Sequence, residues 1–279
     1  MIEEFIKLGE VNRLEVKRIV DFGVYLGSLE ERDDVLLPKK YLNDDVKVED
    51  ILEVFVYSDS EDRYIATTNR PFATLGEFGI FEVVDTAKFG AFVDWGLEKN
   101  LFLPFSAQKG RVKKGDKIIG IIKYDEKTDR LFLDAKIGRN LKKPKNLKRN
   151  DEVEILVIAK TPLGFKVIAN NRYEGMLFSN EIFEDIKIGD KRKAFVKNVR
   201  EDGKLDLTLN PIGKTKEEGV KKVLEKLKLK KKINLTSKSS ADDIKKEFGI
   251  SKKAFKAAIN RLKEENQIEI LDNSINFKN

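Results

Sequence analysis

Two aromatic side chains three residues apart, Phe89 and Phe92, stand in the segment KFGAFVDWG, residues 88–96. In the strand expected here, two small apolar residues alternate with Phe92 and Asp94, which places Phe92 on the outward face beside a carboxylate. Gly90 lets the backbone bend or bulge at the strand entrance, which would bring Phe89 onto the same face. Two exposed rings suit the stacking of nucleobases, at about 1–3 kcal/mol per base. Alternatively, both rings cap the barrel core, because aromatic side chains are usually buried.

The segment KFGAFVDWG, followed by LFLPFS, resembles the S-one motif, the RNA-binding OB-fold repeat of a large ribosomal protein and of many RNA-processing enzymes. The resemblance implies that Phe89 and Phe92 form part of an RNA face. It further implies phosphate contacts near Lys88, Lys123 and Arg130, and an aspartate near the RNA at Asp125. The family often has a histidine where Pro104 stands; because this chain has no histidine, that contact is absent or replaced.

The composition argues against an ordinary enzyme. The 279 residues contain no cysteine and no histidine, which removes disulfides, thiolate nucleophiles, cysteine-based zinc sites and the commonest general base. Carboxylate pairs at Asp33-Asp34, Asp44-Asp45 and Asp242-Asp243 fall in expected turns or helix starts, where acidic residues are common. We therefore expect no catalytic residues, no metal, no cofactor and no small-molecule substrate.

The net charge of +7 hides a gradient along the chain. The balance of basic over acidic residues is −7 for residues 1–70, +2 for 71–140, +4 for 141–213 and +8 for 214–279. A polyanion is attracted to the C-terminal half, because phosphate contacts supply most non-specific affinity. No apolar run approaches the length of about 18 residues that spans a bilayer, and the start MIEEFIKLGE lacks a signal-peptide pattern, so we expect a cytoplasmic protein without membrane contact.

The motif segment belongs to an internal repeat. Offsets of 66–67 and then 74 residues relate the pairs Gly9/Gly76, Gly23/Gly90, Pro38/Pro104, Asp50/Asp116, Gly90/Gly164, Pro104/Phe178 and Asp116/Asp190. Each copy ends in two apolar strands joined by a charged turn, as expected for a barrel of about five short strands. We expect three S-one-like OB domains: 1–70 (acidic, divergent), 71–140 (best match to the motif) and 141–213 (divergent, basic).

The copies differ on the outward face. The position of Phe92 is taken by Tyr25 in the first copy and Lys166 in the third. The first copy keeps two rings, Phe22 and Tyr25, but its acidic surface favours a protein contact or weak binding. In the third copy stacking is weakened while charge is gained, and Arg172, Tyr173 and Phe178 could partly compensate.

A basic stretch, residues 138–150, joins the second and third copies. It either follows a phosphate backbone as a strap or is a solvated linker stiffened by a proline. Its candidate RNA-binding residues are Lys142, Lys143, Lys145, Lys148 and Arg149.

From residue 214 the apolar period changes from 2 to 3.6, which predicts helices. Ser240 and Ser251 are expected helix N-caps, Gly249 is an expected C-cap, and residues 267–277 alternate like a closing hairpin. This order is typical of a winged helix, whose third helix would present Lys252, Lys253 and Lys256. Lysines without arginine favour backbone binding or protein docking over base readout; alternatively, the helix is simply a solvated surface.

Three S-one-like barrels before a winged helix resemble the conserved virulence factor B family of bacterial RNA-binding regulators. The fold expected is therefore mainly β with a C-terminal α+β module. The resemblance implies a non-catalytic protein that binds single-stranded RNA with little sequence specificity, with the ribosome or RNA polymerase as candidate partners. Two alternatives stay open: a DNA-binding transcription regulator acting through the winged helix, and an accessory subunit of an RNA-processing enzyme.

Overall fold

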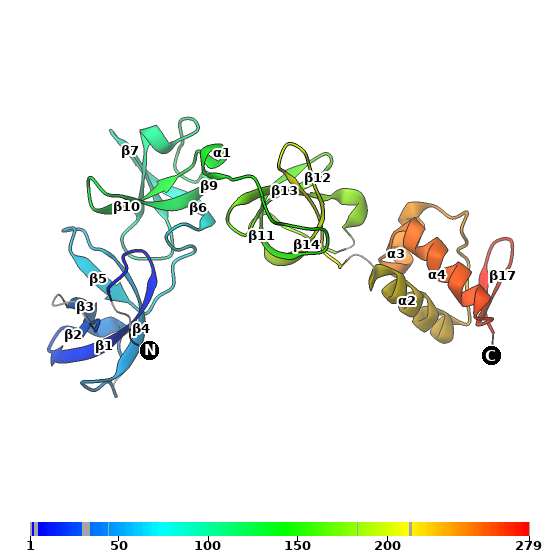
Figure 1. The fold of residues 1–279 in the computed structure, drawn as a ribbon, viewed down its shortest axis with the longest axis horizontal. Coiled ribbons are helices and arrows are strands. Elements are labelled where there is room, and N and C mark those ends of the chain that lie inside the picture. The colour runs from blue at the N-terminus through cyan, green and yellow to red at the C-terminus, as the bar shows by residue number, and fades with distance from the viewer. Residues whose placement is uncertain are drawn as a thin grey trace. The chain divides into compact units, whose positions relative to one another are not determined.

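The computed structural model describes residues 2, 5–29, 34–43, 45–182, 184–211 and 214–278, and consists mainly of β-strands (Figure 1). One compact unit ends at Leu141 and the second begins at Lys142. The first unit holds two closed barrels, and the second holds a third barrel and a helical module. The fold class predicted from the sequence is confirmed.

Each barrel has five strands in the same order. Barrel 1 consists of β1 (Val11–Val20), β2 (Gly23–Gly27), β3 (Val35–Pro38), β4 (Ile51–Ser58) and β5 (Tyr64–Thr67). Barrel 2 consists of β6 (Phe78–Ala87), β7 (Gly90–Asp94), β8 (Leu101–Pro104), β9 (Lys117–Asp125) and β10 (Arg130–Asp134). Barrel 3 consists of β11 (Glu152–Thr161), β12 (Gly164–Ala169), β13 (Tyr173–Phe178), β14 (Lys191–Val199) and β15 (Leu205–Thr208). In each, the third strand pairs in parallel with the fifth and the first pairs with the fourth, which is the topology of the OB fold.

A single turn of 3-10 helix follows the third strand of each barrel. These turns are η1 (Lys39–Tyr41), η2 (Phe105–Ala107) and η3 (Ser179–Glu181). A short helix, α1 (Ile137–Asn140), follows β10. The repetition of turn, strand order and spacing shows that the sequence offsets record a repeated fold.

Steric crowding requires glycine at the start of the second strand of each barrel. A Cβ on Gly23, Gly90 or Gly164 would lie 2.2, 2.4 or 2.0 Å from a backbone carbonyl oxygen of the neighbouring third strand. Of the bend or bulge expected at Gly90, the chain shows the bend, a turn at residues 88–89. The bulge lies instead within β6, where the register shifts between Val83 and Asp85. Glycine is needed here because the two strands approach too closely for any side chain.

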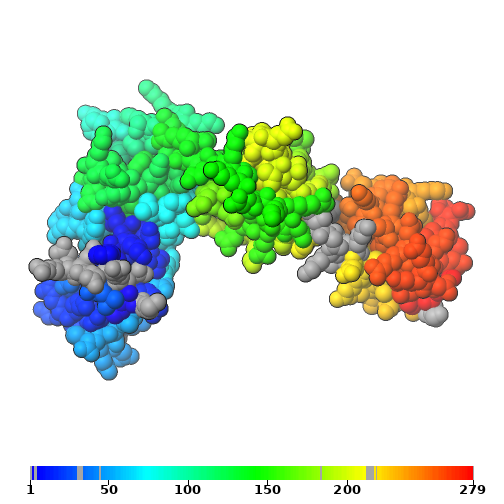
Figure 2. All heavy atoms as spheres, viewed as in Figure 1, coloured from blue at the N-terminus to red at the C-terminus, as the bar shows by residue number. Residues whose placement is uncertain are grey.

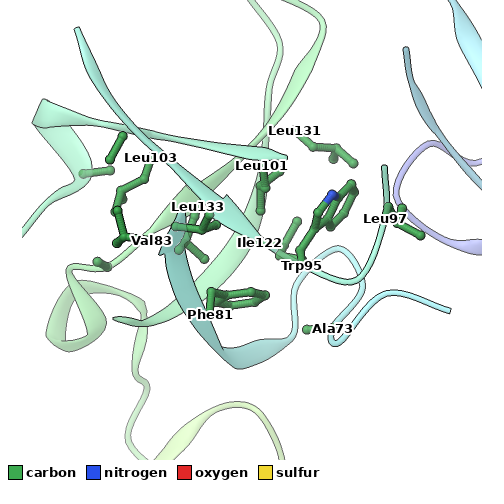
Figure 3. Close-up of a cluster of buried hydrophobic side chains, with 14 of the residues drawn as sticks. Ala73, Phe81, Val83, Trp95, Leu97, Leu101, Leu103, Ile122, Leu131 and Leu133 are labelled. Atoms are coloured by element: carbon green, nitrogen blue, oxygen red, sulfur yellow. The ribbon is translucent and has the colours of Figure 1, made fainter. Parts of the chain in front are cut away.

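Besides the separate core of barrel 1, a second hydrophobic core lies in barrel 2 and is shared with side chains of barrel 1. Phe55 and Tyr57 of β4 are buried with Trp95, the residue after β7, and the ring centroids of Phe55 and Trp95 lie 5.6 Å apart, edge to face. Figure 3 shows Trp95 among apolar side chains of barrel 2, including Leu101, and its indole Nε1 donates a hydrogen bond to a backbone carbonyl. Small barrels bury little apolar surface alone, so the shared core adds stability that neither barrel supplies by itself.

The C-terminal module follows the predicted order. It contains α2 (Lys214–Lys230), β16 (Lys232–Ile233), α3 (Ala241–Phe248), α4 (Lys252–Glu264), β17 (Ile268–Ile270) and β18 (Ile275–Phe277). The two serine N-caps are confirmed, since Ser240 accepts from the amide of Asp243 and Ser251 from that of Ala254. Gly249 takes the left-handed conformation of a helix C-cap, with φ 63°. The three strands form a small sheet in the order β16-β18-β17 against the helices, as in a winged helix.

Candidate nucleic-acid interface

Phe89 is the most exposed of the predicted aromatic residues. It lies with Lys88 in the turn between β6 and β7, and 77% of its surface is accessible. Phe92 projects outward from β7, as its alternation with the buried Ala91 and Val93 predicts. However, Phe92 is half-buried rather than fully exposed, because its ring packs at a tilt against Phe102 of β8, with centroids 5.4 Å apart. Neither ring is sealed in the barrel core.

A groove of about 410 Å³ is lined mainly by barrel 2, with two residues of barrel 1 at its edge. It brings together three of the predicted site residues from three strands: Phe92, Asp125 and Arg130. Two further rings line it, Phe102 of β8 and Phe132 of β10, which are direct neighbours in the parallel pairing of those strands. Three aromatic rings beside an arginine form a surface suited to stacking bases and contacting phosphates.

Sequence reasoning missed several groove residues. Phe102 and Phe132 alternate with buried leucines in LFLP and RLFLD, so the period-2 pattern marks both as outward-facing. Lys99 lies in the β7–β8 loop and carries no comparable pattern. Tyr57 and Ser58 come from barrel 1, and only the packing of the two barrels places them there.

Two of the predicted polar residues have structural partners. Asp125 accepts hydrogen bonds from Thr128 Oγ1 at 2.9 Å and from the amide of Lys127 at 3.1 Å, so it closes the β9–β10 turn. Lys123 donates to Asn140 Oδ1 of α1 at 3.1 Å. Asp125 therefore lines the groove while shaping its edge, and Lys123 is directed toward the start of the linker.

Barrel 1 keeps both rings but covers one of them. Phe22 is 58% exposed, whereas the ring of half-buried Tyr25 lies 3.8 Å beneath the Arg18 guanidinium carbon. The two rings pack edge to face with centroids 6.3 Å apart. Because a cation already occupies one face of Tyr25, less aromatic surface is open to a base here than on barrel 2.

The strand registers confirm the predicted alignment of the three faces. Tyr25 pairs with Leu36, Phe92 with Phe102, and Lys166 with Met176, at equivalent positions of the second and third strands. Lys166 is exposed, so barrel 3 presents a cation where barrel 2 presents a ring.

From Lys142 onward, the basic linker contacts barrel 3. The amide of Lys142 donates to the carbonyl of Arg172 at 2.8 Å, and the Lys143 side chain lies against Gly203. Five linker side chains are exposed: Lys142, Lys143, Lys145, Lys148 and Arg149. Lys142 thus lies beside Arg172, which brings the first lysine of the linker next to another predicted cation.

The first residues of the linker are anchored to barrel 2 by Asp134. This buried carboxylate accepts hydrogen bonds from Asn140 Nδ2 at 2.8 Å, Arg139 Nε at 2.9 Å and the amide of Lys136 at 3.0 Å. Burial alone would raise the pKa of Asp134, but these hydrogen bonds outweigh it and hold the pKa below its ordinary value of 3.8. Arg139 therefore serves to fix α1 to barrel 2.

We expect Asp134→Asn to lower the free energy of unfolding by about 2–3 kcal/mol at pH 7, because the amide cannot accept all these donors and lacks the charge that attracts Arg139. A carboxylate whose pKa falls on folding stabilises the protein above its unfolded pKa, and that stability is lost as the pH drops through the folded value. The difference between wild type and variant should therefore shrink below pH 3.8. Urea unfolding at pH 7 and at pH 3 measures it; an equal difference at both would contradict this role.

The lysines of α4 lie away from the packed face of the winged helix. Phe255, Ala258, Ile259 and Leu262 are buried, as their helical spacing predicts. Lys253 and Lys256 are exposed, and Lys252 at the first position of the helix is half-buried. This face can supply positive charge without disturbing the core.

The described residues show no assembled metal site and no membrane span. Across these ranges, no three His, Cys, Asp or Glu side chains are placed to hold a metal ion. Asp243 accepts from Ser240 Oγ at 2.6 Å within a helix cap, while Asp33 and Asp44 of the other carboxylate pairs lie outside the described residues. None of the helices that the structure describes is long and apolar enough to cross a membrane.

Comparison with known proteins identifies the class of the domains. Residues 8–69 match the S1 domain family, and residues 221–277 match the CvfB-like winged helix domain. The first match falls on barrel 1, one of the two copies expected to diverge from the motif. These two segments therefore match families of nucleic-acid-binding domains rather than catalytic ones.

The relatives extend along most of the chain. The uncharacterized protein YitL of Bacillus subtilis (strain 168) is 27% identical, covering 93% of this chain and 90% of that protein. Conserved virulence factor B of Staphylococcus epidermidis (strain ATCC 12228 / FDA PCI 1200) is 24% identical, with 81% and 80% covered. A crystal structure of a multidomain protein with nucleic acid binding domains from Streptococcus pneumoniae TIGR4 is 24% identical, with 97% and 98% covered and a TM-score of 0.41. The predicted resemblance to the conserved virulence factor B family is confirmed.

Proposed function

We propose that this chain is a non-catalytic RNA-binding protein that holds single-stranded RNA on the outer face of barrel 2. The observation that carries the proposal is the groove in which Phe92, Asp125 and Arg130 meet two further rings, with Phe89 exposed in the turn at the start of β7. Aromatic rings stack on any base, so binding of this kind depends little on sequence.

Positive charge elsewhere supplies the rest of the affinity. In this proposal, the exposed cations of barrel 3, the linker and α4 contact phosphates. Barrel 1, with a charge balance of −7, contributes little to direct RNA binding. The division into domains 1–70, 71–140, 141–213 and 214–279 is part of the same proposal.

The family resemblance suggests the biological setting. We propose a bacterial regulator that acts on gene expression after or during transcription, in contact with RNA and, through it, with the ribosome or RNA polymerase. The absence of an arginine fork among Lys252, Lys253 and Lys256 favours backbone contacts by the winged helix over duplex DNA readout.

The salt dependence of binding tests the proposal. We expect log K for a single-stranded RNA to fall linearly with log salt, with a slope of about −0.7 per phosphate neutralised. Replacing Lys142 and Lys143 with glutamine should make the slope shallower by about 1.4, because two phosphate contacts are lost. The matched control, Lys39→Gln with Lys47→Gln on acidic barrel 1, should leave the slope unchanged.

Fluorescence polarisation with a labelled RNA over a range of salt concentrations provides the measurement. A flat salt dependence would contradict the proposal. If a duplex DNA of equal length competes more strongly than the RNA itself, the DNA-binding alternative replaces it.

A further inference from the structure

A loop of barrel 1 reaches the groove of barrel 2. The β4–β5 loop, residues 59–63, carries Asp62, whose carboxylate pairs with Arg130 and lies 3.6 Å from Lys99 Nζ. Both cations line the groove, although they come from different segments of barrel 2. One acidic side chain of barrel 1 thus holds two cations of the candidate RNA face.

The contact between the two barrels is fixed on either side of Asp62. The Lys99 ammonium also donates to the carbonyl of Asp59. Tyr64 of β5 and Tyr124 of β9 both donate their hydroxyls to Asp129, at 2.9 and 2.7 Å. These hydrogen bonds hold the β4–β5 loop against barrel 2, and they position Asp62 beside Arg130.

The carboxylate occupies a place that suits a phosphate. Arginine and lysine bind carboxylate and phosphate oxygens with the same charge-assisted hydrogen bonds. The two cations stand at a groove lined by Phe92, Phe102 and Phe132, so a nucleotide whose base meets a ring has cations within the same groove for its phosphate. In the RNA-free protein the Asp62 carboxylate takes that position.

We propose that Lys99 and Arg130 form a phosphate subsite for RNA, which Asp62 of barrel 1 occupies until a backbone phosphate displaces it. This inference rests on the function proposed above and adds a role for the acidic barrel: it competes with RNA at the groove. Asp62, Arg130 and Lys99 are 42%, 56% and 36% exposed. Ion pairs this exposed are weak, so a phosphate can replace the carboxylate without unfolding the contact.

Asp62→Asn tests the exchange with little change of shape. Asp62 has φ 62°, in the left-handed region that asparagine also tolerates, so the backbone of the loop is retained. We expect the variant to bind single-stranded RNA about two- to fivefold more tightly, because the competing charge is gone. The matched control is Glu61→Gln, which removes the same charge from the adjacent residue, where Glu61 pairs with Arg63 of the same loop at 2.9 Å.

Arg130→Gln, combined with Asp62→Asn, gives a double-mutant cycle for this ion pair. It should weaken RNA binding more in the Asp62→Asn background than in the wild type, because only in the wild type must Arg130 leave Asp62 before it meets a phosphate. Equal affinities of the Asp62→Asn and Glu61→Gln variants would overturn the proposal, as would an equal loss from Arg130→Gln in both backgrounds. Thermal unfolding of each variant checks that the fold is intact.

A second readout separates this inference from the proposed function. In the full-length protein, titration with inorganic phosphate should shift the NMR signal of the Arg130 Nε–H group, and the shift should saturate at lower phosphate in Asp62→Asn. If RNA does not bind but phosphate gives this result, the proposed function fails and the phosphate subsite stands. If RNA binds with the expected salt dependence but the Arg130 signal responds equally in both proteins, the subsite fails alone.

Discussion

Replacing Phe89 and Phe92 together with alanine should weaken binding of single-stranded RNA by about 30- to 300-fold, which we expect to be the largest effect of any change on the candidate face. Each ring that stacks on a base contributes about 1–3 kcal/mol, and the lower part of this range applies because Phe92 already packs against Phe102. The affinity is measured by fluorescence polarisation with a labelled oligonucleotide at fixed salt concentration.

A single variant and a matched control show whether the loss of affinity comes from the candidate face. Phe89→Ala alone should leave the fold unchanged, because Phe89 is 77% exposed, so any loss of affinity in this variant comes from the face itself. The control is Phe5→Ala, which removes another exposed ring, 51% accessible, from the segment before β1. Affinity that survives the double change, or falls equally with Phe5→Ala, would show that the RNA lies elsewhere.

Phe55→Ala should produce the largest loss of stability, about 3–5 kcal/mol in the free energy of unfolding. Phe55 is fully buried and packs edge to face against Trp95, so its removal leaves a cavity where the first two barrels meet. Trp95 is the only tryptophan in the chain, so its fluorescence reports on this contact directly. Urea unfolding followed by Trp95 emission and by circular dichroism measures the loss.

Val54→Ala is the control for the position of the cavity. Val54 is the neighbouring residue on β4, is also fully buried, and belongs to the separate core of barrel 1. We expect it to lower stability by about 2 kcal/mol without changing the native emission of Trp95. Phe55→Ala should change that emission, and the same native spectrum in both variants would mean that the barrels do not share a core through Phe55.

The shared core links stability to the candidate site. Tyr57, which belongs to the core, also lines the groove, together with its neighbour Ser58 at the end of β4. The Ser58 hydroxyl is buried and has no hydrogen-bond partner among the described residues. The first unit, seen as the blue to green part of Figure 2, therefore joins two repeats whose contact contributes side chains to the candidate RNA face.

The sequence alone determined the repeated architecture, because the signals are local. Alternating apolar residues set which strand faces are buried, and fixed offsets from Gly23 to Gly90 and Gly164 mark equivalent turns. The helix caps at Ser240, Ser251 and Gly249 were equally readable, because capping depends on residues within one turn of the chain. The outward direction of Phe92 follows from the same short-range rule.

Only the tertiary structure decided which partners the side chains of the candidate RNA face contact. The half-burial of Phe92 depends on Phe102, ten residues away on another strand, and the pairing of Arg130 with Asp62 joins residues 68 positions apart. The sequence places Arg139 in the basic stretch 138–150, but its guanidinium forms an ion pair with the buried carboxylate of Asp134. Periodicity records which side of its own strand a residue faces, whereas its partners across a barrel or between barrels depend on how the repeats pack.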